Sequence, residues 1–158
     1  MKFTHQFQIQ APLAVVADFH AQADSMGRIT PPPIITQFHR APIRLNDGDE
    51  IEFTLWFGPL PLPWLARIEA GPGDDPHTIT FTDRQLRGPF AAWAHRHTFT
   101  ALNTTTTLVI DEIEADLSPQ LFWKLVGLGM WLSLPLLFAY RRWQTQRLLT
   151  SDKPADKR

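Results

Sequence analysis

The run LVGLGMWLSLPLLFAY, from Leu125 to Tyr140, decides which folds this chain can adopt. It holds sixteen residues without a charge, and it is bounded by Lys124 on one side and by Arg141 and Arg142 on the other. A helix needs roughly 17–25 apolar residues to span a bilayer, so the run is slightly too short. A helix that is apolar nearly all round is otherwise a buried helix. We therefore expect it to be pressed into a β-sheet.

The chain before this helix alternates between apolar and polar residues in short segments, which is the pattern of half-buried strands. We predict strands at residues 3–9, 34–39, 49–57, 64–70, 77–85, 92–101 and 104–115. Two short helices are expected after the first strand, beginning at Pro12, and Pro59, Pro61 and Pro63 are expected to interrupt the connection before residue 64.

The order of these elements predicts an α+β fold. Six strands in succession favour an antiparallel sheet, because parallel pairs need long crossover connections. A single terminal helix must then bury its apolar side on one face of that sheet. We expect a curved antiparallel sheet of about seven strands wrapped around the long C-terminal helix, with a space between the two.

Length and composition exclude several classes of protein. The 158 residues suit one domain, which we place at 1–150, followed by a disordered polar tail at 151–158. The 15 Lys+Arg against 16 Asp+Glu give no basic surface for nucleic acid. The absence of cysteine excludes disulfides, thiolate nucleophiles and cysteine zinc sites. The absence of cysteine also fits the cytoplasmic location that we expect. The N-terminus lacks the apolar run of a signal peptide, which favours the same location.

The densest chemical signal is Trp93-x-His95-x-His97-x-Phe99, whose spacing of two puts all four side chains on one face of a strand. Asp111 would lie near both histidines across the hairpin if this face points inward. Three interpretations remain open. The residues form a buried hydrogen-bonded network, they orient a ligand, or they perform acid/base chemistry.

We expect neither a metal nor a cofactor. His95, His97 and Asp111 could supply three ligands, but the sequence has no HExxH, no cysteine and no third histidine at a local spacing. It also has no GxGxxG, no Walker loop and no G-x-S-x-G elbow. The remaining histidines have no evident grouping in the sequence: His5, His20, His39 and His77.

Apolar and aromatic residues of the predicted strands and helix would line the space between them. Wide apolar pockets with few polar groups are typical of small-molecule sites. Together with the polar residues, the predicted ligand-binding set is Phe53, Leu55, Phe57, Trp64, Phe81, Asp83, Gln85, Trp93, His95, His97, Phe99, Asp111, Met130, Trp131 and Leu134.

These motifs, in this order, resemble the SRPBCC superfamily of START-like, Bet v 1-like and polyketide cyclase/dehydrase proteins, and within it small bacterial ligand-binding members. The resemblance covers nearly the whole chain and implies the helix-grip fold with an internal apolar cavity for lipids, hydrophobic metabolites or polyketides. The motifs that carry it are Thr30-Pro31-Pro32, Asp47-Gly48, Phe81-x-Asp83-x-Gln85, Gly88-Pro89-Phe90, Trp93-x-His95-x-His97-x-Phe99, Thr107 and Asp111.

From these observations we expect a binding protein for a hydrophobic or amphipathic small molecule such as a lipid, an aromatic or a polyketide-like compound. The alternative is a cyclase- or dehydratase-like enzyme that uses His95, His97 and Asp111 as acid/base groups. A third hypothesis is an accessory protein whose C-terminal helix contacts a membrane surface. The sequence leaves the oligomeric state open.

Overall fold

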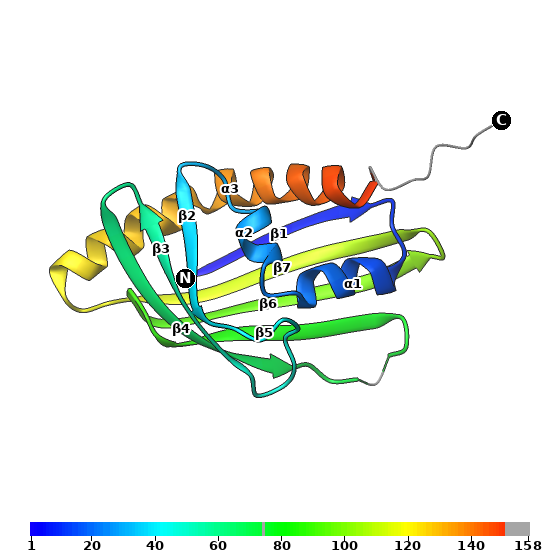
Figure 1. Ribbon diagram of the computed structural model, residues 1–158, viewed down its shortest axis with the longest axis horizontal. Helices are drawn as coiled ribbons and strands as arrows, with labels where there is room; N and C mark the ends of the chain where they lie inside the picture. Colours follow the sequence, from blue (N-terminus) through cyan, green and yellow to red (C-terminus); the bar gives the residue numbers. More distant parts are fainter. Residues whose placement is uncertain (74, 151–158) are drawn as a thin grey trace.

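The computed structural model describes residues 1–73 and 75–150, and its strands form one seven-stranded antiparallel sheet in the order β1-β7-β6-β5-β4-β3-β2 (Figure 1). The predicted fold class is therefore confirmed, whereas the predicted tail at 151–158 lies outside the described residues. The elements are β1 (Lys2–Ile9), α1 (Leu13–Ala21), α2 (Ser25–Arg28), β2 (Ile34–Arg40), β3 (Glu50–Phe57), β4 (Leu60–Ala70), β5 (Thr78–Arg87), β6 (Phe90–Asn103), β7 (Thr106–Leu117) and α3 (Leu121–Thr150).

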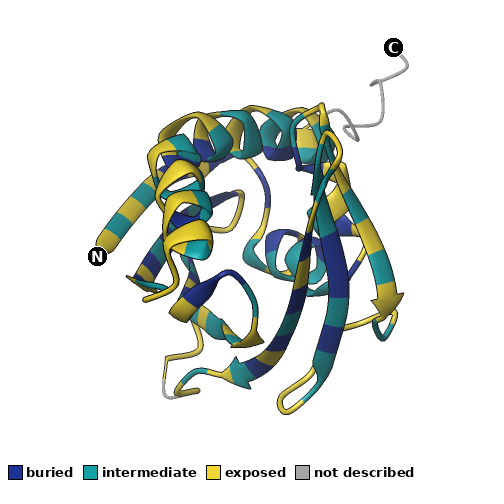
Figure 2. Ribbon diagram, turned by 90° about the vertical axis from the view of Figure 1, so that its left-hand side faces the viewer, coloured by how far each residue is buried: buried dark blue, intermediate teal, exposed yellow. Residues whose placement is uncertain are grey.

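The three helices lie on the concave side of the curved sheet (Figures 1 and 2). Helix α3 contacts β1, β7 and β6, while α1 contacts β6 and β7, and α2 contacts β2. The helices therefore cover different parts of the same face. They enclose the space in which the candidate site lies.

Pro59 lies in the turn between β3 and β4, but Pro61 and Pro63 belong to β4, so the predicted interruption is wrong for these two prolines. In β4, Pro61 pairs with Trp56 and Pro63 pairs with Thr54 of β3. The other neighbour, β5, pairs with β4 only from Leu65 onward. Proline lacks an N–H and is tolerated in a strand whose outer edge has no partner. The first part of β4 is such an edge, which explains how it accommodates both prolines.

Helix α3 packs on the sheet along one narrow stripe of side chains. Gly127, Leu134, Phe138 and Thr145 are buried, and their spacing of seven, four and seven residues places them on one side of the helix. Phe138 is 1% exposed, and its ring lies 5.4 Å from that of Phe3 in β1. This stripe joins the C-terminal helix to the first strand.

The opposite side of α3 is exposed and apolar, which corrects the prediction of a helix pressed into the sheet all round. Only 17% of the most apolar stretch of α3 is buried, and by length and composition alone the helix could cross a membrane. Figure 2 shows the exposed residues along its outer side. The sheet touches one side of the helix, and none of the described elements covers the other. We call the exposed residues Leu121, Leu125, Leu128, Leu132 and Leu136 the outer leucine stripe.

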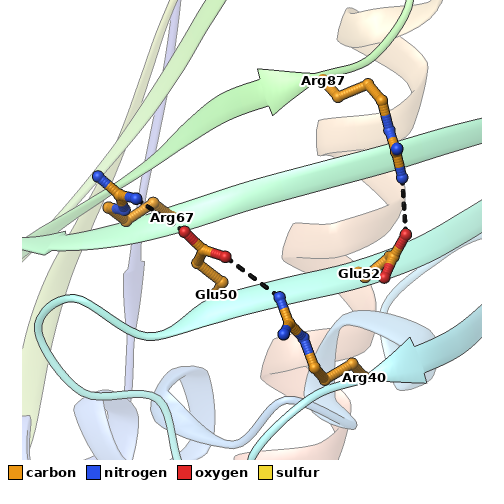
Figure 3. A network of polar contacts seen from close by, with 5 residues as sticks. All are labelled: Arg40, Glu50, Glu52, Arg67 and Arg87. Carbon is orange, nitrogen blue, oxygen red and sulfur yellow. Dashed lines mark hydrogen bonds and ion pairs between the residues drawn. The ribbon is translucent and has the colours of Figure 1, made fainter.

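The convex face of the sheet carries ion pairs between neighbouring strands (Figure 3). Glu50 contacts Arg40 at 3.1 Å and Arg67 at 2.7 Å, and Glu52 contacts Arg87 at 2.6 Å. Such exposed pairs each contribute at most about 1 kcal/mol. Their main consequence is that the convex face is polar, so the apolar space of the domain is confined to the concave side.

We expect Phe138→Ala to lower the free energy of unfolding by about 3–5 kcal/mol, because it removes a buried aromatic ring between α3 and the sheet. Leu136→Ala is the matched control on the same helix, since Leu136 is 78% exposed. Its effect should stay within about 0.5 kcal/mol. Urea denaturation followed by circular dichroism measures both changes, and equal losses would contradict the assigned packing of α3.

Candidate functional site

A cavity of about 130 Å³ lies on the concave side, between the sheet and the three helices. Its wall is mainly apolar, and the aromatic rings in it come from β3, β4, β5, β6 and α3. The predicted site residues that line it are Phe53, Leu55, Phe57, Trp64, Phe81, Asp83, Trp93, His95, His97, Met130 and Leu134.

Four residues of the predicted set do not line the cavity: Gln85, Phe99, Asp111 and Trp131. The Gln85 side-chain amide donates a hydrogen bond to the Phe90 carbonyl at 2.9 Å, which ties it to the β5–β6 turn. Phe99 is fully buried in the core below α1. Trp131 packs edge-on against Phe3. Asp111 lies behind the two histidines, so it acts on the cavity only through them.

The two histidines point inward and meet at Asp111. The register of the sheet pairs His97 directly with Asp111 across β6 and β7. His95 Nε2 lies 3.0 Å from Asp111 Oδ1 and forms a buried hydrogen bond with it. His97 Nδ1 lies 3.0 Å from the same oxygen, but this contact lacks the alignment of a hydrogen bond. One carboxylate oxygen therefore faces both imidazoles.

Asp83 approaches the same two imidazoles from the other side. It pairs directly with His95 across β5 and β6. Its Oδ2 lies 3.7 Å from His95 Nδ1 and 3.6 Å from His97 Nε2, which is too long for hydrogen bonds. The imidazole ring centroids are 3.9 Å apart. The cluster thus consists of two adjacent rings between two carboxylates, and it lies in a mainly apolar wall.

The two carboxylates set the charge of the cluster. Burial alone would lower the pKa of His97, but its contacts with Asp111 and Asp83 raise that pKa to about 9. Burial and the neighbouring His97 lower the pKa of His95. Burial opposes ionisation of Asp111, yet the two histidines hold its pKa well below the usual range. At neutral pH His97 is charged, His95 is neutral and Asp111 is ionised.

Polar residues that the sequence analysis did not select also line the cavity, among them the two that can carry a charge, His20 and Arg141. His20 stacks on Phe99 with ring centroids 4.9 Å apart, and its Nε2 is buried without a hydrogen-bond partner. The Arg141 guanidinium lies 5.2 Å from the ring centre of Phe138. Helical spacing carries a signal for both, since His20 lies four residues after the buried Val16 and Arg141 lies three after Phe138.

Comparisons with known proteins support the fold. No protein-family model matches the sequence, and a search of curated proteins gives no match. Norcoclaurine synthase from Thalictrum flavum, solved with dopamine and hydroxybenzaldehyde, has a TM-score of 0.69 at 11% identity and covers 98% of this chain and 88% of its own. An aromatase/cyclase from a Streptomyces species has a TM-score of 0.66 at 14% identity and covers 96% of this chain and 98% of its own.

A third solved structure is 25% identical over 92% of this chain, with a TM-score of 0.62. It is a nucleoside-diphosphate sugar epimerase from Corynebacterium glutamicum, of which the match covers only 28%. Together these likenesses show that the chain shares the fold of these solved structures. The helix-grip architecture inferred from the motifs is therefore that of the chain.

The buried His20 should make the domain sensitive to acid. Burial lowers its pKa from 6.5 to about 3, so between these values the unfolded chain takes up a proton that the folded chain does not. Its contribution to stability is therefore lost progressively as the pH falls below about 6.5. The titratable and charged groups that face His20 are His95, His97, Asp111 and Arg141.

We expect His20→Phe to have a flatter decline of stability in acid, because phenylalanine can stack on Phe99 without titrating. Urea denaturation of both proteins between pH 4 and pH 7 measures the slopes. The variant should gain stability relative to wild type as the pH falls. Parallel curves would show that His20 does not stay neutral in the folded protein.

Proposed function

We propose that this protein binds a small apolar or amphipathic molecule in the cavity between the sheet and α3. The observation that carries the proposal is a mainly apolar wall, rich in aromatic rings, into which the charged and polar cluster of Asp83, His95 and His97 projects. Sites for small molecules combine such walls with a few convergent polar groups that fix orientation. In the structurally similar norcoclaurine synthase, the bound molecules are dopamine and hydroxybenzaldehyde.

The aromatic wall suits a flat or elongated apolar body. Phe53 and Trp64 lie nearly parallel, with ring centroids 6.1 Å apart, and Trp93 meets Trp64 edge-on at 5.5 Å. The cavity volume of about 130 Å³ is close to the roughly 150 Å³ of an apolar protein cavity that accepts benzene. A ligand with at least one aromatic ring or an equivalent aliphatic body fits this space.

The polar cluster would orient the other end of the ligand. The side chains of Asp83, His95, His97 and Arg141 all reach the cavity. A hydroxyl or carbonyl oxygen of the ligand can accept a hydrogen bond from the charged His97, while Asp83 can accept one from a hydroxyl. We infer that the protein selects amphipathic molecules over pure hydrocarbons, because burying these polar groups without partners is costly.

The same cluster supports the alternative of a cyclase- or dehydratase-like enzyme. The pKa of His97 is raised to about 9, so this imidazole is protonated at neutral pH and could donate a proton to a ligand oxygen. The neutral His95, oriented by Asp111, could accept one. Turnover that is lost in His95→Gln while ligand affinity persists would favour the enzyme over the binding protein.

We expect saturable changes of tryptophan fluorescence when aromatic or fatty-acid ligands are titrated, because Trp64 and Trp93 line the cavity. Ala66→Phe adds bulk inside the cavity and should weaken the affinity at least tenfold. The matched control is Leu65→Phe on the neighbouring residue, which points to the opposite face of β4. Thermal denaturation verifies that both variants fold. Equal affinity in the two variants would place the ligand elsewhere.

We further propose that the outer leucine stripe contacts an anionic lipid surface. Its five leucines are exposed, as are Phe122 and Trp143 near the two ends of α3. The exposed charged residues of the helix are Lys124, Arg142 and Arg147, and the helix has no acidic residue, whereas Arg141 faces the cavity. An exposed apolar patch beside cations fits the interface of an anionic bilayer.

Sedimentation with lipid vesicles tests this contact. We expect the protein to sediment with vesicles containing phosphatidylserine, and binding to decrease at high salt or with vesicles of phosphatidylcholine alone. Replacing Leu125 and Leu132 by aspartate should abolish sedimentation, whereas Leu86→Asp, at an exposed leucine of β5, should not. A helix-mediated dimer in sedimentation velocity, lost in the Leu125/Leu132 variant and without vesicle binding, would contradict the proposal.

A further inference from the structure

The polar cluster contains three atoms that can act as metal ligands: Asp83 Oδ2, His95 Nδ1 and His97 Nε2. All three lie within 4.8 Å of one another. The carboxylate oxygen is 3.7 Å from the first nitrogen and 3.6 Å from the second. Ligands bound tetrahedrally to Zn²⁺ at about 2.0–2.1 Å are separated from each other by roughly 3.4 Å. The observed separations are close to this value and too long for direct hydrogen bonds.

On the side of the two imidazoles away from Asp83, Asp111 occupies the position of the carboxylate that holds metal-binding histidines in place. Asp111 Oδ1 lies 3.0 Å from His95 Nε2 and 3.0 Å from His97 Nδ1, on the ring nitrogens that face away from Asp83. Histidines that bind a metal nearly always direct their other nitrogen to a carboxylate, a carbonyl or water. Asp111 thus orients the His95 ring by a hydrogen bond and contacts His97 Nδ1 as an ion pair, and the remaining nitrogen of each ring lies on the side of Asp83.

The three ligand residues line the cavity, whereas Asp111 does not. A metal held by them would therefore keep its remaining coordination position toward the cavity, as in zinc sites with three protein ligands. Asp83 and Asp111 together balance a dication, and the nearby Arg141 favours an anionic fourth ligand such as hydroxide or a carboxylate. His20, whose buried Nε2 has no partner, lies beside His97 with ring centroids 6.0 Å apart.

We propose that Asp83, His95 and His97 bind a divalent metal ion, Zn²⁺ in preference, with Asp111 as the positioning residue and an open coordination site facing the cavity. From the sequence alone, Asp111 was the candidate for the third ligand, and no third histidine lies at a local spacing. The structure brings the third ligand from β5, the neighbouring strand. This inference goes beyond small-molecule binding and does not require it. Metal binding at His97 Nε2 would displace the proton that this imidazole carries in the metal-free protein.

Cobalt substitution tests the site directly. The protein is prepared without a histidine tag, treated with a chelator, dialysed and titrated with Co²⁺, and bound metal is counted by mass spectrometry. We expect one Co²⁺ per chain with the strong visible absorption of tetrahedral coordination, and Zn²⁺ should displace it. Absence of stoichiometric metal binding would overturn the proposal.

Variants separate the ligands from the supporting residue. Asp83→Asn should abolish the cobalt absorption, and it should fold because the Asp83 side chain keeps 27% of its surface accessible. Asp111→Asn should retain the absorption but weaken affinity roughly 10- to 100-fold, as expected for a residue that orients ligands. The control Asp75→Asn, at an exposed carboxylate before β5, should match wild type. Unchanged binding in Asp83→Asn would overturn the assigned ligands.

A thermal shift gives a second readout. Zn²⁺ should raise the melting temperature of the wild type and of Asp75→Asn, but leave that of Asp83→Asn unchanged, because only a metal bound to the folded state stabilises it. Fluorescence titration of aromatic ligands on the metal-free protein is measured separately. Failure of metal binding with intact ligand binding refutes the metal site alone, and the reverse result refutes the proposed cavity ligand alone.

Discussion

The contact of one buried carboxylate with two imidazoles constrains how β6 and β7 can pair. Asp111 is 6% exposed and faces both His95 and His97, so its charge is compensated only while β6 and β7 keep their register. A shift of one residue would turn the carboxylate to the convex face and leave both rings without it. The polar cluster therefore stabilises one pairing of the two longest strands, and the cavity wall follows from that pairing.

Helix α3 combines two roles that depend on opposite sides. Its inner side supplies Leu134 and Phe138 to the cavity wall, and its outer side exposes the outer leucine stripe. Because one rigid helix carries both, a displacement of its outer side would also move the residues that enclose the cavity. This coupling is a direct consequence of a helix that packs on the sheet along a single narrow stripe.

The alternation of apolar and polar residues was sufficient to predict the seven strands, their order along the chain and the side of β6 that faces inward. This is possible because the geometry of a strand itself sets a period of two. It was insufficient wherever a neighbour in space decides the outcome. Pro61 and Pro63 remain in β4 because β5 does not reach them. Helical spacing places His20 and Arg141 on the buried sides of α1 and α3, but only the packing of these helices shows that both residues reach the same cavity. The exposed side of α3 was not predicted, because a continuous apolar run does not show how many sides of the helix pack against the rest of the protein.

The order of the sheet also constrains how the chain can fold. Strands β2 to β7 follow one another as neighbours, so each can form a local hairpin soon after its predecessor. Strand β1 instead pairs with β7, where Phe3 meets Ile113 across most of the chain. Such non-local pairing is slow, because the chain loses the entropy of loop closure before the contacts that compensate for this loss can form. The first strand must therefore remain unpaired until β7 is available, and their pairing links the start of the chain to the strand that precedes α3.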